Sequence, residues 1–153
     1  MAARQRRSRS RREFDPDAPP RASTREKTRE KPPAESVEPS ALAREICRRY
    51  RAEYPDEGQR YGEAGVAWCV HDNQHILNWT ILAAYDNLDL RAQVSWLAKV
   101  LEARDFPLDR LARDLELAAD VTREQEAGGP DIAERLAVEA AYVRSKPSFL
   151  AER

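Results

Sequence analysis

Several features that would define a function class are scarce or missing. The 153 residues include only two cysteines, two histidines and five glycines. The longest uninterrupted apolar run is AGVAWCV at residues 64–70, far short of the roughly 20 residues that a membrane-spanning helix needs. There is no glycine-rich phosphate-binding loop and no repeat at a fixed period. We therefore expect neither a membrane span nor a P-loop nucleotide site.

The few cysteines also bear on the cellular compartment. Cys47 and Cys69 each lie within an apolar helical pattern, which fits reduced, buried thiols of an intracellular protein better than a disulfide framework. The segment SRREF at residues 10–14 resembles the start of a twin-arginine export signal, but DPDAPPRAST follows it instead of an apolar stretch. We therefore expect a protein that stays in the cytoplasm.

Charge divides the chain into two parts. Residues 1–39 hold eleven Lys or Arg against seven Asp or Glu, about +4, and the rest holds fifteen against twenty, about −5. The first part also contains six of the ten prolines and almost no large apolar side chains. Such a segment buries too little apolar surface to offset the entropy of ordering, so we expect a disordered tail.

The beginning of this tail is strongly basic. Six arginines and no acidic residue fall within MAARQRRSRSRR at residues 1–12. They could bind the phosphates of a nucleic acid or an acidic protein surface, although a tail that merely keeps the protein soluble is an equal alternative. The arginines are Arg4, Arg6, Arg7, Arg9, Arg11 and Arg12.

From Ser40 onward, apolar residues recur at helical spacing, and no segment alternates like a strand. Ser40 is a suitable N-cap, and Pro107 suits the first turn of a helix. Helices are predicted over residues 40–53, about 60–85, 90–101, 107–127 and 131–146. The fold class is therefore all-α. Residues 40–146 are predicted to form a five-helix bundle with a long central helix, and residues 147–153 a C-terminal tail.

The segment WCVHDNQHILNW at residues 68–79 carries two histidines four residues apart, the helical spacing of zinc ligands in many metalloproteases. Projected at about 100° per residue, its apolar side chains surround most of the helix. A helix that is apolar nearly all round is buried, which predicts the central element of the bundle. His71 falls in a polar stripe. Asp72 falls in the apolar sector, where an unpaired carboxylate is costly.

Three interpretations of this segment remain open. Asp72 could form a buried pair with His75, or with Arg104 or Arg110 from the following helices. A metal site would use His71 and His75, yet the chain has no third histidine to complete it. A ligand pocket is the third interpretation. Its lining would be Trp68, Asp72, His75 and Trp79.

Two segments, YGEAGVAWCVHDNQHIL at 61–77 and VSWLAKVLEARDFPLDRL at 94–111, resemble a bacterial all-helical module associated with sensory and cobalamin-related regulatory proteins. The resemblance covers about residues 50–120. Gln74 and Asp105 depart from it, because the pattern has an aromatic residue and a glycine there. It implies a regulatory or interaction domain rather than an enzyme. The matching residues are Tyr61, Gly62, Glu63, Gly65, Cys69, Asp72, His75, Trp96, Leu97, Arg104 and Pro107.

We therefore expect a non-enzymatic regulatory or interaction module. Its bundle would bind a partner or small ligand near Trp68, Asp72, His75 and Trp79, and its basic tail would act as an electrostatic anchor. One alternative is a metal- or tetrapyrrole-binding helical protein with His75 as the main ligand. Another is a nucleic-acid-binding accessory protein that works through the arginine-rich tail, although the bundle is acidic and has no basic recognition helix. The sequence does not identify a cofactor.

Overall fold

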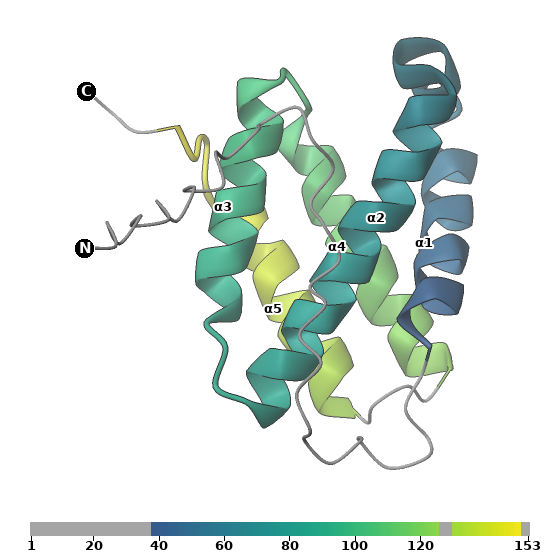
Figure 1. The fold of residues 1–153 in the computed structure, drawn as a ribbon. Helices are drawn as coiled ribbons and strands as arrows, with labels where there is room; N and C mark the ends of the chain where they lie inside the picture. Colours follow the sequence, from purple (N-terminus) through teal and green to yellow (C-terminus); the bar gives the residue numbers. More distant parts are fainter. Residues whose placement is uncertain (1–37, 126–129, 151–153) are drawn as a thin grey trace, which may run out of the picture.

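The computed structural model describes residues 38–125 and 130–150. Within these ranges every regular element is a helix, so the predicted all-α class is confirmed. None of these helices is long and apolar enough to cross a lipid bilayer. Figure 1 shows the helices, which are α1 (Pro39–Glu53), α2 (Glu57–Tyr85), α3 (Leu90–Ala103), α4 (Leu108–Glu124) and α5 (Pro130–Ser145).

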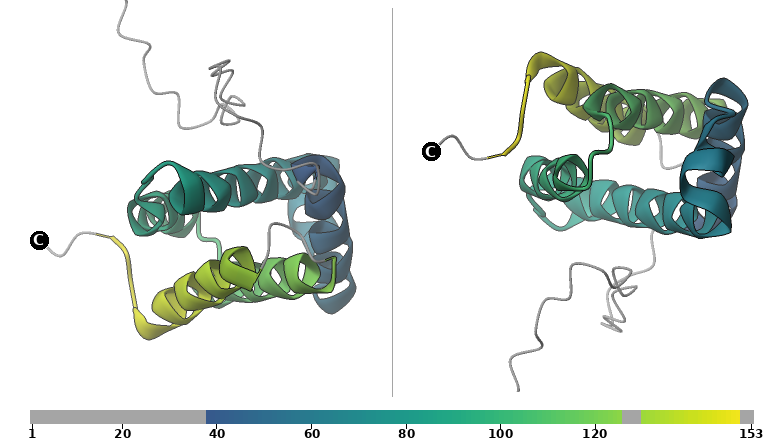
Figure 2. Two further views of the ribbon diagram at one scale, coloured as in Figure 1. Left: turned by 90° about the horizontal axis from the view of Figure 1, so that it is seen from below. Right: turned by 90° about the horizontal axis from the view of Figure 1, so that it is seen from above.

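The helices form two layers that α1 closes on one side. The end-on views of Figure 2 show α2 and α3 in one layer and α4 and α5 in the other. α1 packs against both α2 and α4 and so bridges the two layers. On the opposite side α3 faces α5, and the segment that follows α5 runs from α5 towards α3 there.

All five helices contribute to one hydrophobic core. Each fully buried large aliphatic side chain contributes about 1.5–3 kcal/mol relative to an exposed one, so the periodic apolar faces that predict the helices also hold them together. One such side chain from each helix, in chain order, is Ile46, Ile76, Val94, Leu115 and Leu136.

α2 is the long helix that the sequence predicts, but it is not buried all round. Its fully buried side chains are Asn73, Ile76, Leu77 and Thr80, which lie on one face. The Thr80 hydroxyl donates a hydrogen bond to the carbonyl of Ile76 at 2.7 Å, so burial leaves it satisfied. α2 lies in a layer of only two helices, which encloses its inner face alone. Asn73 and Thr80, the two polar residues that interrupt the apolar pattern, are therefore among the most buried residues of α2.

The helix ends differ in detail from the prediction. α1 begins at Pro39 rather than after Ser40, because proline at the first helical position has the required φ and no N–H to leave unpaired. The expected polar break separates α2 from α3, and the Asp89 side chain accepts the N–H of Ala92 at 3.0 Å to cap α3. Pro107 lies just before α4 instead of within its first turn.

Two glycines shape the start of α2. Gly62 has φ 62° and ψ −158°, so the backbone breaks there between two helical pieces. Only glycine adopts such a conformation without strain. A Cβ on Gly65 would lie 2.5 Å from the Cβ of Tyr61. Gly62 is therefore required by the backbone conformation, and Gly65 by the lack of space for a side chain.

The short first piece of α2 is fixed to α4 by one arginine. The Arg110 guanidinium lies 2.6 Å from Glu57 and 3.0 Å from Asp56. Glu57 also accepts a hydrogen bond from the Tyr50 hydroxyl at 2.7 Å. Charge-assisted contacts therefore help to hold the turn between α1 and α2.

Candidate functional site

The side chains predicted to form a ligand pocket lie half-buried along α2. Rings stand one helical turn apart: the ring centres of His71 and His75 are 6.4 Å apart, and those of His75 and Trp79 are 5.7 Å apart. Trp96 of α3 continues the series, edge-on to Trp79 at 6.4 Å. The structure thus brings two of the predicted pocket residues, His75 and Trp79, into one row with His71, and the row ends at α3.

Asp72 lies near Arg104, one of the partners that the sequence suggested. Burial raises the pKa of Asp72 to about 7, and the positive charge of Arg104 partly opposes this rise. The Arg104 guanidinium also lies 5.6 Å from the ring centre of Trp68. The other suggested arginine, Arg110, is engaged instead with the turn before α2.

The two histidines stack nearly parallel, with their ring planes at 21°. His71, expected in a polar stripe, is half-buried, and its Nδ1 atom is shielded without a hydrogen-bond partner among the described residues. In that same part of the chain, no group of three or more His, Cys, Asp and Glu side chains is placed to hold a metal ion. Among the described residues, no third side chain is therefore placed to complete a metal site with these histidines.

A polar cluster lies inside the bundle between α1, α2 and α4. Asn73 Nδ2 donates to Asp114 Oδ1 at 3.0 Å and to the carbonyl of Cys69 at 3.0 Å. The same nitrogen lies 3.5 Å from Cys47 Sγ and 3.6 Å from Cys69 Sγ. Both cysteines are free thiols. Asn73 thus connects a carboxyl group and two sulfur atoms in the core.

Asp114 is the most deeply buried carboxyl group of this cluster. Burial raises its pKa to about 7, the hydrogen bond from Asn73 opposes the rise, and the nearby charge of Asp72 adds to it. Two carboxyl groups within the bundle therefore change protonation near neutral pH. Nothing in the apolar periodicity of α4 marked Asp114, because a polar residue on that face looks like a gap in the pattern.

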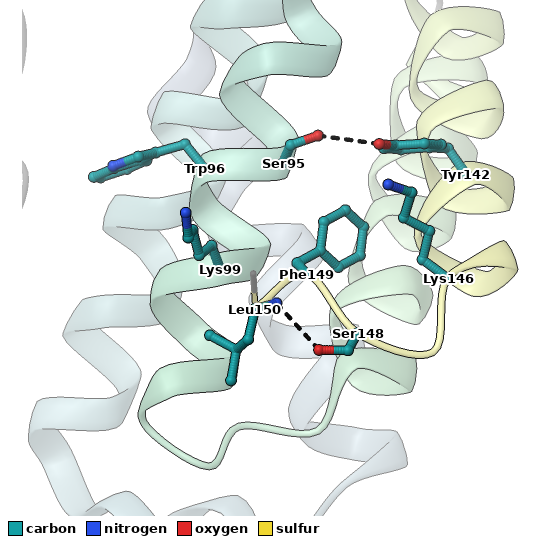
Figure 3. A pocket seen from close by; sticks show the side chains of 8 residues that line it. All are labelled: Ser95, Trp96, Lys99, Tyr142, Lys146, Ser148, Phe149 and Leu150. Atoms are coloured by element: carbon teal, nitrogen blue, oxygen red, sulfur yellow. Dashed lines mark hydrogen bonds between the residues drawn. The ribbon is translucent and has the colours of Figure 1, made fainter. Parts of the chain in front are cut away.

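A groove of about 550 Å³ opens between α3 and α5. Figure 3 shows its side chains, which come from α3, from the last turn of α5 and from the segment after α5. The sequence did not predict this site. The α3–α5 groove is lined by Ser95, Trp96, Lys99, Tyr142, Lys146, Ser148, Phe149 and Leu150.

Aromatic rings and cations alternate on the α5 side of the groove. The rings of Tyr142 and Phe149 meet edge-on with their centres 5.7 Å apart. Lys146 Nζ lies 5.3 Å from the first ring centre and 5.4 Å from the second. The Arg91 guanidinium covers the Tyr142 ring at 4.1 Å. Hydrogen bonds from Ser95 and Lys146 lower the pKa of the Tyr142 hydroxyl.

The segment after α5, expected as part of a C-terminal tail, is attached to α3 as far as Leu150. Glu102 Oε2 accepts the backbone N–H groups of Phe149 at 2.7 Å and of Leu150 at 3.2 Å. These hydrogen bonds lower the pKa of Glu102, and the one from Phe149 has the largest effect. Glu102 thereby holds one wall of the α3–α5 groove in place.

The lysines of the chain are distributed unevenly. There are four in total, and Lys27 and Lys31 precede the bundle. The other two, Lys99 and Lys146, both line the α3–α5 groove. Within the described residues neither of these forms an ion pair with a carboxylate. This distribution is visible in the sequence, but it becomes informative only when the fold brings residues 99 and 146 together.

The six tail arginines, Arg4 to Arg12, lie outside the described residues.

Comparison of the chain with protein-family models, with curated proteins and with solved structures found no match. The chemistry of the described side chains is therefore the basis for a functional proposal.

Proposed function

We propose that this protein is a non-enzymatic binding module whose helical bundle holds a small organic anion with a flat ring, such as an aryl carboxylate, in the α3–α5 groove. If the protein is a regulatory or interaction module, its interaction with a partner would depend on whether the ligand is bound in the groove. The proposal keeps the small-ligand role expected from the sequence and moves its site from Trp68, Asp72, His75 and Trp79 to the groove.

The placement of Lys99 and Lys146 is the observation that carries this proposal. The bundle is acidic overall, and its arginines are widely used in ion pairs, as Arg49, Arg110 and Arg113 illustrate. The two ammonium groups of the groove lack such carboxylate partners within the described residues. A ligand carboxylate or sulfonate would supply the missing negative charge.

The rings and the size of the groove support an aromatic body for the ligand. Trp96, Tyr142 and Phe149 offer apolar faces beside the ammonium groups. Aromatic rings prefer offset or edge-to-face contacts with another ring. Small-molecule sites have volumes of about 300–1,000 Å³, a range that includes this groove.

The polar lining favours recognition over catalysis. The groove is lined by ammonium and hydroxyl groups, and no carboxylate or imidazole is among its lining residues. General acid–base catalysis most often relies on one of those two groups. The lining therefore suits the orientation of an anion better than proton transfer to and from a substrate.

Lysine modification with an internal reference tests the proposal. The full chain is reductively methylated with and without 1-naphthoate, and the modification of each lysine is measured by peptide mass spectrometry. We expect 1-naphthoate to slow methylation of Lys99 and Lys146 but not of Lys27 and Lys31. Equal rates at all four lysines with and without the probe would overturn the proposal.

Calorimetric titration of variants gives an independent measurement. Lys99→Met and Lys146→Met should each weaken 1-naphthoate binding by about three- to tenfold, the range for partly exposed charge pairs. Arg123→Met removes one positive charge elsewhere and should leave the affinity unchanged. The uncharged 1-naphthalenemethanol should bind more weakly than the carboxylate. Equal binding of the two probes would show that the lysines do not select the ligand.

The arginine-rich tail has a separate role in this proposal, that of an electrostatic anchor on an acidic partner. Heparin serves as the polyanion probe. Deletion of residues 1–12 should weaken retention on immobilised heparin and reduce its dependence on salt, because fewer counterions are released on binding. Retention that is unchanged by the deletion would remove the anchor from the proposal and leave the groove unaffected.

A further inference from the structure

The two cysteines of the chain meet in the buried polar cluster although 22 positions separate them. Cys47 comes from α1 and Cys69 from α2, and their Sγ atoms lie 2.6 Å apart. The sequence has no other cysteine, so this pair has no competitor for disulfide formation within the chain. The pair joins α1 to α2, and Figure 2 shows α1 on the side of the bundle opposite to the one where α3 faces α5.

We infer that Cys47 and Cys69 are a site of reversible covalent modification, at which thiol–disulfide exchange with a small-molecule disulfide joins α1 to α2. The reagent class is that of glutathione disulfide. The reduced bundle and the cross-linked bundle would then be two covalent forms of one fold.

Exchange proceeds in two balanced steps. The Cys69 thiolate attacks one sulfur of glutathione disulfide, which forms a mixed disulfide and releases one glutathione thiolate that takes up the proton lost by Cys69. The Cys47 thiolate then attacks Cys69 Sγ, forms the intrachain disulfide and releases the second glutathione as its thiol. Two protein thiols are oxidised, and one glutathione disulfide is reduced to two thiols.

The surroundings of the pair make this exchange slow while the bundle is closed. Cys47 is fully buried and Cys69 is half-buried, so a reagent reaches Cys69 first. The hydrogen bond to Cys47, burial and the charge of Asp114 raise the pKa of the Cys69 thiol. Because the thiolate is the attacking species, the closed bundle protects the pair. Oxidation should accelerate when α1 opens away from α2.

The cross-linked form is compatible with the rest of the cluster. Asn73 Nδ2 lies beside both sulfur atoms, and its main partners are the Asp114 carboxyl group and a backbone carbonyl. None of these groups has to be buried anew when the bond forms. Closure of a loop of this length should raise the ratio of folded to unfolded protein by about 100-fold, through the lost entropy of the unfolded chain.

Equilibration of the full chain in glutathione redox buffers tests the inference. Free thiols are trapped by alkylation, the intact mass is recorded, and the cross-linked peptide is identified. We expect a monomeric product that has lost two hydrogen atoms, with Cys47 bound to Cys69, and a faster approach to equilibrium in mild urea. Cys47→Ser and Cys69→Ser should give only the mixed disulfide with glutathione.

The decisive quantity is the effective concentration of one thiol toward the other, measured in the folded chain and again in fully denaturing urea. We expect a value about 100-fold higher in the folded chain, which matches the increase in stability by thermodynamic linkage. Equal values, or a lower value in the folded chain, would overturn the inference, because the fold would then not favour the bond. Access to the thiols does not limit this comparison, since mild urea lets the folded sample reach equilibrium.

Discussion

Replacement of Asp114 by asparagine should change how the stability of the bundle depends on pH. Asp114 is buried on α4, where it accepts a hydrogen bond from Asn73. Its pKa is raised from 3.8 to about 7, mainly by burial. An asparagine at this position keeps an oxygen that can accept the same hydrogen bond, but it cannot become charged.

The sign of the effect follows from the direction of the shift. Because the pKa of Asp114 is higher in the folded than in the unfolded protein, folding favours its protonated form. The stabilisation from this preference is complete below about pH 4, decreases as the pH rises and is lost above about pH 7. A shift from 3.8 to about 7 corresponds to about 4 kcal/mol of unfolding free energy between these limits.

Urea denaturation followed by circular dichroism measures this effect directly. The unfolding free energies of the wild-type chain and Asp114→Asn are compared between about pH 4.5 and about pH 8. The unfolding free energy of the variant minus that of the wild type should increase by several kcal/mol from the acidic to the basic end of this range. Asp72 titrates near neutral pH in both proteins and largely cancels in the difference.

A matched variant separates burial from the simple loss of a negative charge. Asp120 is on the same helix, but its side chain is about half-exposed. Asp120→Asn therefore reports what the removal of one carboxylate from α4 does without desolvation. If the difference between Asp114→Asn and the wild type were constant with pH, the argument from burial would be wrong.

Three further predictions concern the backbone and the ion pairs. Gly62→Ala should lower the unfolding free energy by about 1–2 kcal/mol, because residue 62 has a positive φ. Gly58→Ala is the control. A Cβ at this position would meet no atom within 4 Å, so this variant should be as stable as the wild type or more stable in the same urea experiment. Arg110→Met should cost about 2–3 kcal/mol by urea denaturation, since it leaves the largely buried carboxylate of Glu57 without its partner. Arg123→Met is the control, at about 0.5 kcal/mol or less. Glu102→Ala should accelerate hydrogen exchange in the segment after α5 and weaken 1-naphthoate binding, because it removes the acceptor of two backbone N–H groups.

Each of these predictions has a contradicting outcome. Equal effects of Gly62→Ala and Gly58→Ala would show that the positive φ is not the constraint. An Arg110→Met variant as stable as Arg123→Met would mean that the turn before α2 is held by other contacts. For Glu102, the lowered pKa implies that its hold is present at neutral pH and weakens as the pH falls through that value. Hydrogen exchange of the last segment that is unchanged both in Glu102→Ala and at acidic pH would contradict this role.

Helical periodicity was sufficient to predict the fold, because each helix buries one apolar stripe in the same core. One backbone detail at the turn after α3 is not visible in that periodicity. Asp105 has φ 61°, the left-handed conformation that glycine adopts most easily. The details that the sequence missed are those that depend on neighbours, such as the start of α1 at Pro39 rather than after Ser40.

The candidate site could not be predicted in the same way. Sequence reasoning concentrated on two histidines within one helix, because a local spacing can be seen without a fold. The α3–α5 groove instead depends on contacts such as that between Ser95 and Tyr142, which are 47 positions apart. Asn73 was counted as an interruption of an apolar face, and only the packing of α2 on α1 and α4 reveals its buried partners.

The hydrogen bond between Asn73 and Asp114 selects one register between α2 and α4. Leucine and alanine contacts alone tolerate a slide of one helix by a turn, because one apolar side chain can replace another. A slide of α2 by one turn would place Cys69 or Leu77 opposite Asp114, which would then lack its amide donor. A buried polar group without a partner costs about 1–3 kcal/mol. This one amide therefore discriminates against misaligned packings that the apolar residues alone would accept.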